Sequence, residues 1–141
     1  MAGNALATCT DYHVFAGFLD GEGCIRVQDG VVVVEVTTCS LPSLQELREV
    51  FGGNLRRRKK RASHHRRQWT WSVRGAEACV ALIVCEEFLR EKRAQAAVAL
   101  AYCKVCDSLE IGESGRRAAA TILDKSLRYL KTMEHDDAPP S

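Results

Sequence analysis

A chain of 141 residues, 46% hydrophobic and 27% charged, has the length and composition of one globular domain, which argues against a disordered chain. No apolar run, Val31 to Val34 included, approaches the length needed to cross a bilayer. The net charge of +2 is unevenly spread: Asn54 to Arg74 holds nine Lys or Arg and no acid, and the remainder carries eleven basic and eighteen acidic residues. Such a basic block favours a polyanionic partner, nucleic acid first, with a solvated charged hairpin as the alternative.

The seven cysteines show no spacing that repeats like a disulfide framework, which favours a reducing compartment. Cys103 and Cys106 have the spacing of half a zinc site, but no second pair completes it and both fall in a predicted helix, so helix packing is favoured over zinc. The first ten residues lack a basic start followed by an apolar core. We therefore expect an intracellular protein, in the cytoplasm or inside the organelle that encodes it, without a secretion signal.

The first predicted helix starts at a cap formed by Thr10 or Asp11 and ends near Gly21 and Gly23. Its apolar residues form two groups, one of Tyr12, Phe15, Ala16 and Leu19 and the other of Val14, Gly17 and Phe18. A helix that is apolar on two sides is expected to be buried on both.

The turn signal Asp29-Gly30 predicts a hairpin of strands 24–28 and 31–38. Helical spacing of Leu44, Leu47, Val50 and Phe51 predicts a second helix that ends at Gly52-Gly53. Strands over 55–61 and 68–74, joined by the basic loop, come next, and helices are predicted over 76–88, 90–106 and 116–131. Residues 1–133 are expected to form the domain and residues 134–141 a flexible tail.

This order predicts an α+β fold with an αββαββα core, in which helices cover one face of a four-stranded antiparallel sheet and the other face meets solvent. Trp69, Trp71 and Val73 share the covered face. Strand alternation assigns to the open face Cys24, Arg26, Gln28, Val33, Glu35, Thr37, Arg56, Arg58, Lys60, Gln68, Thr70, Ser72 and Arg74. Most are polar side chains of the kinds that pair with base edges and phosphates, and two-stranded ribbons fit the DNA major groove.

The nine residues Phe15-Ala16-Gly17-Phe18-Leu19-Asp20-Gly21-Glu22-Gly23 resemble the signature of the LAGLIDADG homing endonucleases. Later segments resemble further landmarks of this family in the same order: Phe51-Gly52-Gly53-Asn54-Leu55, Trp69-Thr70-Trp71, and the run from Phe88 to Ala96. The resemblance extends from Asp11 to Cys106. It implies a saddle-shaped sheet and a metal-dependent nuclease that cuts double-stranded DNA at a specific site.

The resemblance also implies the chemistry, since phosphodiester hydrolysis is served well by Mg²⁺ (or Mn²⁺) held by carboxylates. Glu22 takes the position of the metal-binding acid and the Gly21 carbonyl that of a second ligand, whereas Asp20 is expected to be structural. Lys92 matches the family's basic residue near the active site, where a cation can stabilise the transition state. Thr38 replaces a polar Gln found in one class of the family, which leaves a water-positioning contact in doubt.

A single motif implies a homodimer, because cutting two strands takes two active sites. The predicted interface is Phe15, Ala16, Gly17, Phe18 and Asp20, since Ala16-Gly17 would permit close approach of the partner's helix; packing on a helix of the same chain is the alternative. The predicted DNA contacts are the open-face residues Arg26, Gln28, Glu35, Thr37, Arg56, Arg58, Lys60, Gln68, Thr70, Ser72 and Arg74. Two other functions on this scaffold remain open: an RNA maturase with intron RNA as partner, and a non-catalytic DNA-binding regulator.

Overall fold

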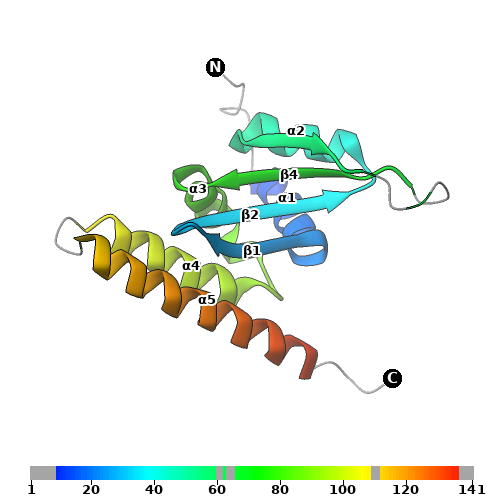
Figure 1. Cartoon of the computed structure of the whole chain (residues 1–141). Coiled ribbons are helices and arrows are strands. Elements are labelled where there is room, and N and C mark those ends of the chain that lie inside the picture. The colour runs from blue at the N-terminus through cyan, green and yellow to red at the C-terminus, as the bar shows by residue number, and fades with distance from the viewer. Residues whose placement is uncertain (1–8, 60–61, 63–65, 109–111, 137–141) are drawn as a thin grey trace.

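The computed structural model describes residues 9–59, 62, 66–108 and 112–136. The elements are α1 (Cys9–Glu22), β1 (Gly23–Gln28), β2 (Val31–Thr38), α2 (Leu41–Phe51), β3 (Asn54–Arg57), β4 (Trp69–Arg74), α3 (Ala76–Cys85), the 3-10 helix η2 (Glu86–Phe88), α4 (Arg93–Cys106) and α5 (Gly112–Asp136). The strands form one antiparallel sheet in the order β1-β2-β4-β3. In Figure 1, α1 and α2 lie behind the sheet, and α4 and α5 run below β1. The predicted α+β class and αββαββ order are confirmed.

Turn residues with positive φ fix the hairpin and the end of α2. Asp29 (φ 53°) and Gly30 (φ 79°) form the tight turn between β1 and β2, where both central residues must take left-handed values. Gly52 (φ 78°) ends α2 and donates its backbone N–H to the Arg48 carbonyl at 2.8 Å. At Gly53 a Cβ would stand 2.5 Å from the Ser72 carbonyl oxygen, so the chain can enter β3 there only with glycine.

The core lies between the covered face of the sheet and the helices. The register aligns Ile25 with Val34 and Val34 with Val73, and all three are buried. Trp71 is fully buried and its indole N–H donates to the Gly52 carbonyl at 2.9 Å, which satisfies its one polar group. Burial of Trp71 and Val73 and partial burial of Trp69 confirm the predicted covered face.

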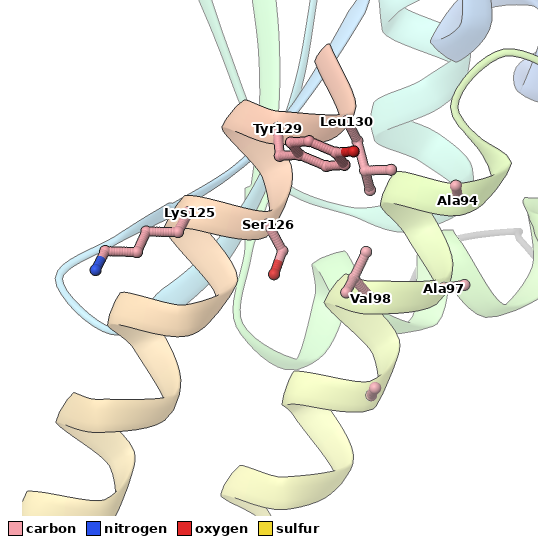
Figure 2. A pocket seen from close by; sticks show the side chains of 8 residues that line it. Ala94, Ala97, Val98, Lys125, Ser126, Tyr129 and Leu130 are labelled. Carbon is pink, nitrogen blue, oxygen red and sulfur yellow. The ribbon is translucent and has the colours of Figure 1, made fainter. Parts of the chain in front are cut away.

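Helix α5 packs along α4 and reaches the free edge of β1, where the Lys131 ammonium donates to the Ile25 carbonyl at 2.9 Å. This contact pairs an edge-strand carbonyl that has no strand neighbour on that side. Between the two helices runs a groove lined by Ala94, Ala97, Val98, Ala101, Lys125, Ser126, Tyr129 and Leu130 (Figure 2). Within the described ranges, no helix combines the length and the apolar character that crossing a membrane requires.

Several predicted boundaries shift in the structure. Strand β3 ends at Arg57 rather than Arg61, although the Arg58 N–H still donates to the Gln68 carbonyl at 2.8 Å. Helix α4 starts at Arg93, because the preceding residues form a loop that binds α1, as described below. Helix α5 starts earlier than predicted, at Gly112, and continues through Asp136, three residues beyond the expected domain boundary.

A disulfide joins Cys79 of α3 to Cys103 of α4, a pairing that the cysteine spacing did not indicate. It excludes Cys103 from the half zinc site considered above. Cys85 is fully buried, and burial raises the pKa of its thiol to about 12, so it is a protonated core residue.

The disulfide closes a loop between residues 24 positions apart, so its reduction should destabilise the fold. Loop-closure entropy predicts a loss of about 3 kcal/mol in the free energy of unfolding. Urea unfolding with and without a dithiol reductant measures this difference. The double variant Cys79→Ser/Cys103→Ser is the control, and its stability should not respond to the reductant. If the reductant lowered the stability of the double variant as much as that of the wild type, reduction of this disulfide would not be the cause of the loss.

Candidate nucleic-acid interface and active site

The open face of the sheet carries the polar side chains that strand alternation assigned to it. The strand register places Cys24, Glu35, Ser72 and Asn54 in one row across the four strands. A second row joins Thr37, Thr70 and Arg56, and a third joins Arg26, Val33 and Arg74. Asn54 was missed because the predicted strand began one residue later, although counting back by two from Arg56 would have found it.

Salt bridges and hydrogen bonds connect several of these side chains. Glu35 Oε2 lies 3.0 Å from Arg26 Nη2 and 3.7 Å from Arg56 Nη2. Arg26 Nη1 also donates to Gln28 Oε1 at 2.7 Å. The open face therefore holds an ordered charged network that reaches from β1 to β3.

One of the predicted DNA contacts, Thr70, is buried. Thr70 is only 3% exposed, and its hydroxyl shares a 2.8 Å hydrogen bond with the Thr37 hydroxyl, which is part-buried. The Thr70 hydroxyl is thus already engaged within the sheet, and its predicted contact with DNA stays a prediction. Arg56, Arg58, Gln68 and Arg74 are exposed and Ser72 is partly exposed, whereas Lys60 lies outside the described residues.

The carboxyl end of α1 is fastened to the loop that precedes α4. The Asp20 carboxylate accepts the backbone N–H of Arg90 at 2.8 Å and that of Lys92 at 3.0 Å. In return, the Lys92 ammonium donates to the Asp20 backbone carbonyl at 2.7 Å. Asp20 therefore has the structural role predicted for it, and it brings the Lys92 cation to the end of α1. We call these three contacts the Asp20 clasp.

Glu22, the last residue of α1, is exposed, as is Gly21 before it. Among the described residues no group of three or more His, Cys, Asp or Glu could hold a metal ion. Thr38, at the end of β2, accepts a hydrogen bond from the Ser40 backbone N–H at 3.4 Å through its hydroxyl. The structure thus places Lys92 close to the Glu22 end of α1 and Thr38 on a separate element.

The two apolar faces of α1 have different environments. Phe15, Ala16 and Leu19 are buried in the core of the chain itself, which removes Phe15 and Ala16 from the predicted interface, and the Asp20 carboxylate is engaged in the clasp. On the opposite face, Val14 is 51% exposed and Phe18 is partly exposed.

Two glycines complete this exposed face of α1. A Cβ built on Gly17 or on Gly21 would meet no described atom within 4 Å. The alternative that Gly17 permits packing on a helix of the same chain therefore finds no such helix in the described part of the chain. We call Val14, Gly17, Phe18 and Gly21 the outer stripe; their spacing of three and four residues puts them on one helix face.

The α4–α5 groove in Figure 2 differs in character from the open face of the sheet. Its lining is largely apolar, with Lys125 and Ser126 as polar members and no carboxylate. It therefore lacks the acidic ligands that a divalent cation requires.

Neither a family profile nor a curated protein matches the sequence. The fold matches solved structures. The homing endonuclease I-CvuI in complex with its target has a TM-score of 0.69 and 22% identity, over 86% of this chain and 82% of that one. The archaeal intron-encoded homing endonuclease I-Vdi141I, complexed with DNA, has a TM-score of 0.60 and 14% identity over 90% and 96% of the two chains. The LAGLIDADG homing endonuclease I-SmaMI, bound to cleaved DNA, has a TM-score of 0.64 and 15% identity over 92% of this chain and 50% of that one.

The chain therefore has the fold of the LAGLIDADG homing endonucleases, as the motif predicted. The segment that carries the motif residues Phe15 to Gly23 occupies α1 and the first residue of β1.

The Asp20 clasp should contribute measurably to stability. Asp20→Asn removes the charge and one acceptor oxygen and turns amide hydrogens toward the backbone N–H of Arg90 or Lys92. Because hydrogen bonds to a charged group contribute about 1.5 to 3 kcal/mol, the free energy of unfolding should fall by about that amount. The control is Asp124→Asn, which affects an exposed pair with Arg128 and should cost no more than about 0.5 kcal/mol. If chemical denaturation showed equal losses of unfolding free energy for Asp20→Asn and Asp124→Asn, the stabilising role of the Asp20 clasp would be contradicted.

Proposed function

We propose that this chain is a site-specific double-stranded DNA endonuclease that acts as a homodimer. The observation that carries the proposal is the juxtaposition of exposed Glu22 and the Lys92 ammonium at the end of α1, one residue before the polar sheet begins. The homing endonuclease fold and the DNA named in the related structures support the same function. No comparable observation favours an RNA maturase or a non-catalytic regulator.

The sheet is the proposed DNA surface. Arg26, Arg56 and Arg74 on its open face can bind phosphates or pair bidentately with guanine. Arg58 and Lys59, both exposed, extend the basic character beyond the end of β3, whose last residue is the exposed Arg57. Contacts to the DNA backbone would position the protein, and contacts to base edges would select the site.

A divalent cation, proposed to be Mg²⁺, would bind at Glu22 with the Gly21 carbonyl as a second ligand. The donor set fits, because Mg²⁺ is commonly held by one or two carboxylates while water and substrate phosphate complete its shell. When bound, the ion would lower the pKa of a coordinated water and neutralise the developing phosphate charge. I-CvuI has been crystallised on DNA in the presence of calcium and of magnesium, which supports a divalent ion in this chain too.

Lys92 is proposed as the second catalytic residue. Its ammonium is held beside the end of α1 by the Asp20 carbonyl. From there it can place a positive charge near the scissile phosphate and stabilise the negative charge that builds up in the transition state.

The homodimer is proposed from the outer stripe and the single Glu22. An exposed apolar face on a helix whose other side is already in the core needs a partner, and Gly17 and Gly21 would let a second helix approach closely. In a two-fold contact that partner is the same stripe of a second copy, which brings two Glu22 carboxylates near each other. I-SmaMI, of which this chain spans half, is long enough to hold two units of this size.

The cellular site is proposed to be the reducing interior of the cell or of the encoding organelle. The thiols of Cys24, Cys39, Cys85 and Cys106 are unpaired in the structure, which suits such a compartment, whereas the Cys79–Cys103 disulfide is of a kind that is rare there.

Glu22→Gln should abolish Mg²⁺-dependent cleavage and leave DNA binding nearly intact, since it removes an anionic ligand and keeps the side chain's size. The cleavage rate should fall by about a hundredfold or more, the scale seen when one transition-state contact is lost. A target is first selected from a randomised duplex library with Mg²⁺, and then gel shift and cleavage are measured on it. Glu49→Gln, an exposed acid on α2, is the charge-matched control. Cleavage by Glu22→Gln at the wild-type rate would remove Glu22 from the active site.

Gly17→Leu should weaken the dimer and leave each subunit folded, because the added side chain meets no described atom of its own chain within 4 Å of its Cβ. Overpacking at a helix contact costs about 1 to 3 kcal/mol, or about 5- to 150-fold in the dissociation constant. Sedimentation equilibrium measures the association of both forms, with Ala118→Leu on the exposed side of α5 as control. A wild type that remains monomeric on its DNA, or a Gly17→Leu variant that dimerises normally, would show that the outer stripe is not the interface.

A further inference from the structure

Glu35 is the only acidic residue in the four strands, all of whose residues the structure describes, and it stands on the open face. The same strands hold four arginines, Arg26, Arg56, Arg57 and Arg74. A carboxylate on a surface that meets phosphates weakens binding by like-charge repulsion. Because Glu35 lies in the middle of the proposed DNA surface, we expect it to have a function that offsets this loss of affinity for DNA.

The contacts of Glu35 indicate what this function is. One carboxylate oxygen, Oε2, lies 3.0 Å from Arg26 Nη2 and 3.7 Å from Arg56 Nη2, so two arginines from β1 and β3 converge on β2. The Glu35 side chain is 19% exposed, against 34% for Arg26 and 61% for Arg56. The Glu35 side chain is thus more buried than the two arginine side chains that it pairs with, which leaves the arginines better placed to meet a duplex.

Arg26 is held at two points. Its Nη2 faces Glu35, and its Nη1 donates to Gln28 Oε1 at 2.7 Å. A guanidinium has five N–H donors in a rigid plane, so these two contacts fix the plane and leave other donors for a base edge. An unrestrained arginine side chain loses rotamer freedom when it binds a base, which costs affinity. The Arg26 side chain is already ordered before binding, so this cost is smaller.

We propose that Glu35 is a specificity-determining positioning residue: it orients Arg26 and Arg56 for reading bases and reduces their attraction to phosphates of any sequence. This inference rests on the proposed DNA-binding function. In this proposal Glu35 acts through the two arginines, which share its Oε2, and does not itself read a base. The partner recognised in this way is a duplex with hydrogen-bond acceptors, such as guanine O6 and N7, under Arg26 and Arg56.

The test measures the binding of the full-length protein to its selected duplex and to an unrelated duplex over a range of salt concentrations. Glu35→Gln removes the charge and keeps the shape. It should tighten binding to the unrelated duplex, steepen the salt dependence by about one unit, and reduce the ratio of specific to non-specific affinity by about tenfold. Glu46→Gln removes an exposed acid from α2, on the covered side of the sheet, and should leave that ratio unchanged.

A second variant separates orientation from charge. Glu35→Asp keeps the charge and shortens the side chain by one methylene group, which draws the carboxylate away from both guanidinium groups. It should relax the sequence preference without steepening the salt dependence. A Glu35→Asp protein with unchanged sequence preference would overturn the positioning role, even if Glu35→Gln proved poorly folded.

Selection profiles identify the bases concerned. Arg26→Ala and Arg56→Ala each mark the base positions that one arginine reads, and Glu35→Gln should relax those same positions. In the double variant Arg26→Ala/Arg56→Ala, adding Glu35→Gln should change the sequence preference no further. Relaxation at a position that neither arginine variant affects would show that Glu35 reads a base directly, and would overturn the proposal.

The outcomes also separate this inference from the function on which it rests. A wild type that does not discriminate between duplexes contradicts the proposed function, and this inference with it. A wild type that selects and cuts its site, together with a Glu35→Gln variant of unchanged specificity, contradicts the role of Glu35 alone.

Discussion

The geometry of the candidate active site depends on one reciprocal set of hydrogen bonds, the Asp20 clasp. A carboxylate at the end of α1 binds two backbone N–H groups of the loop before α4, and a lysine of that loop returns its ammonium to the helix. Because Asp20 is two residues before Glu22, the clasp fixes both the helix end and the cation beside it. The Glu22 side chain remains exposed. Asp20 therefore holds the helix end to the loop, whereas Glu22, two residues later, stays accessible.

Alternation along the strands distributes the remaining chemistry. The same period of two that buries Ile25, Val34 and Trp71 turns Arg26, Glu35 and Thr70 to the other face. Burial on one side therefore fixes the register, and the register fixes which polar groups become neighbours across strands. The pairing of Arg26 and Arg56 with a single carboxylate is a consequence of this arrangement, since the two arginines lie on opposite edge strands of the sheet.

Local patterns could be predicted from the sequence, and pairings between distant segments could not. The Asp29-Gly30 turn, the end of α2 at Gly52 and the two apolar groups on α1 each depend on residues close in sequence, and all were found. The partners of Asp20 are 70 and 72 residues away, and Cys79 is 24 residues from Cys103, so no periodicity reveals these contacts. Spacing likewise defined two faces of α1 but could not decide that Phe15 and Ala16 belong to the inner one, because that depends on which helices and strands pack against it.

Basic and acidic residues are unevenly distributed over the fold. The four strands hold four arginines and one acid, and the exposed segment after β3 adds Arg58 and Lys59, whereas Glu46 and Glu49 lie on α2 and Glu77 and Glu87 on the stretch that follows β4. A net charge of only +2 therefore conceals an uneven distribution, in which the strands and the segment after β3 are strongly basic. Positive charge gathered in one region attracts polyanions to that region. Within that basic surface a single carboxylate lowers the local positive potential, because Glu35 pairs with both Arg26 and Arg56.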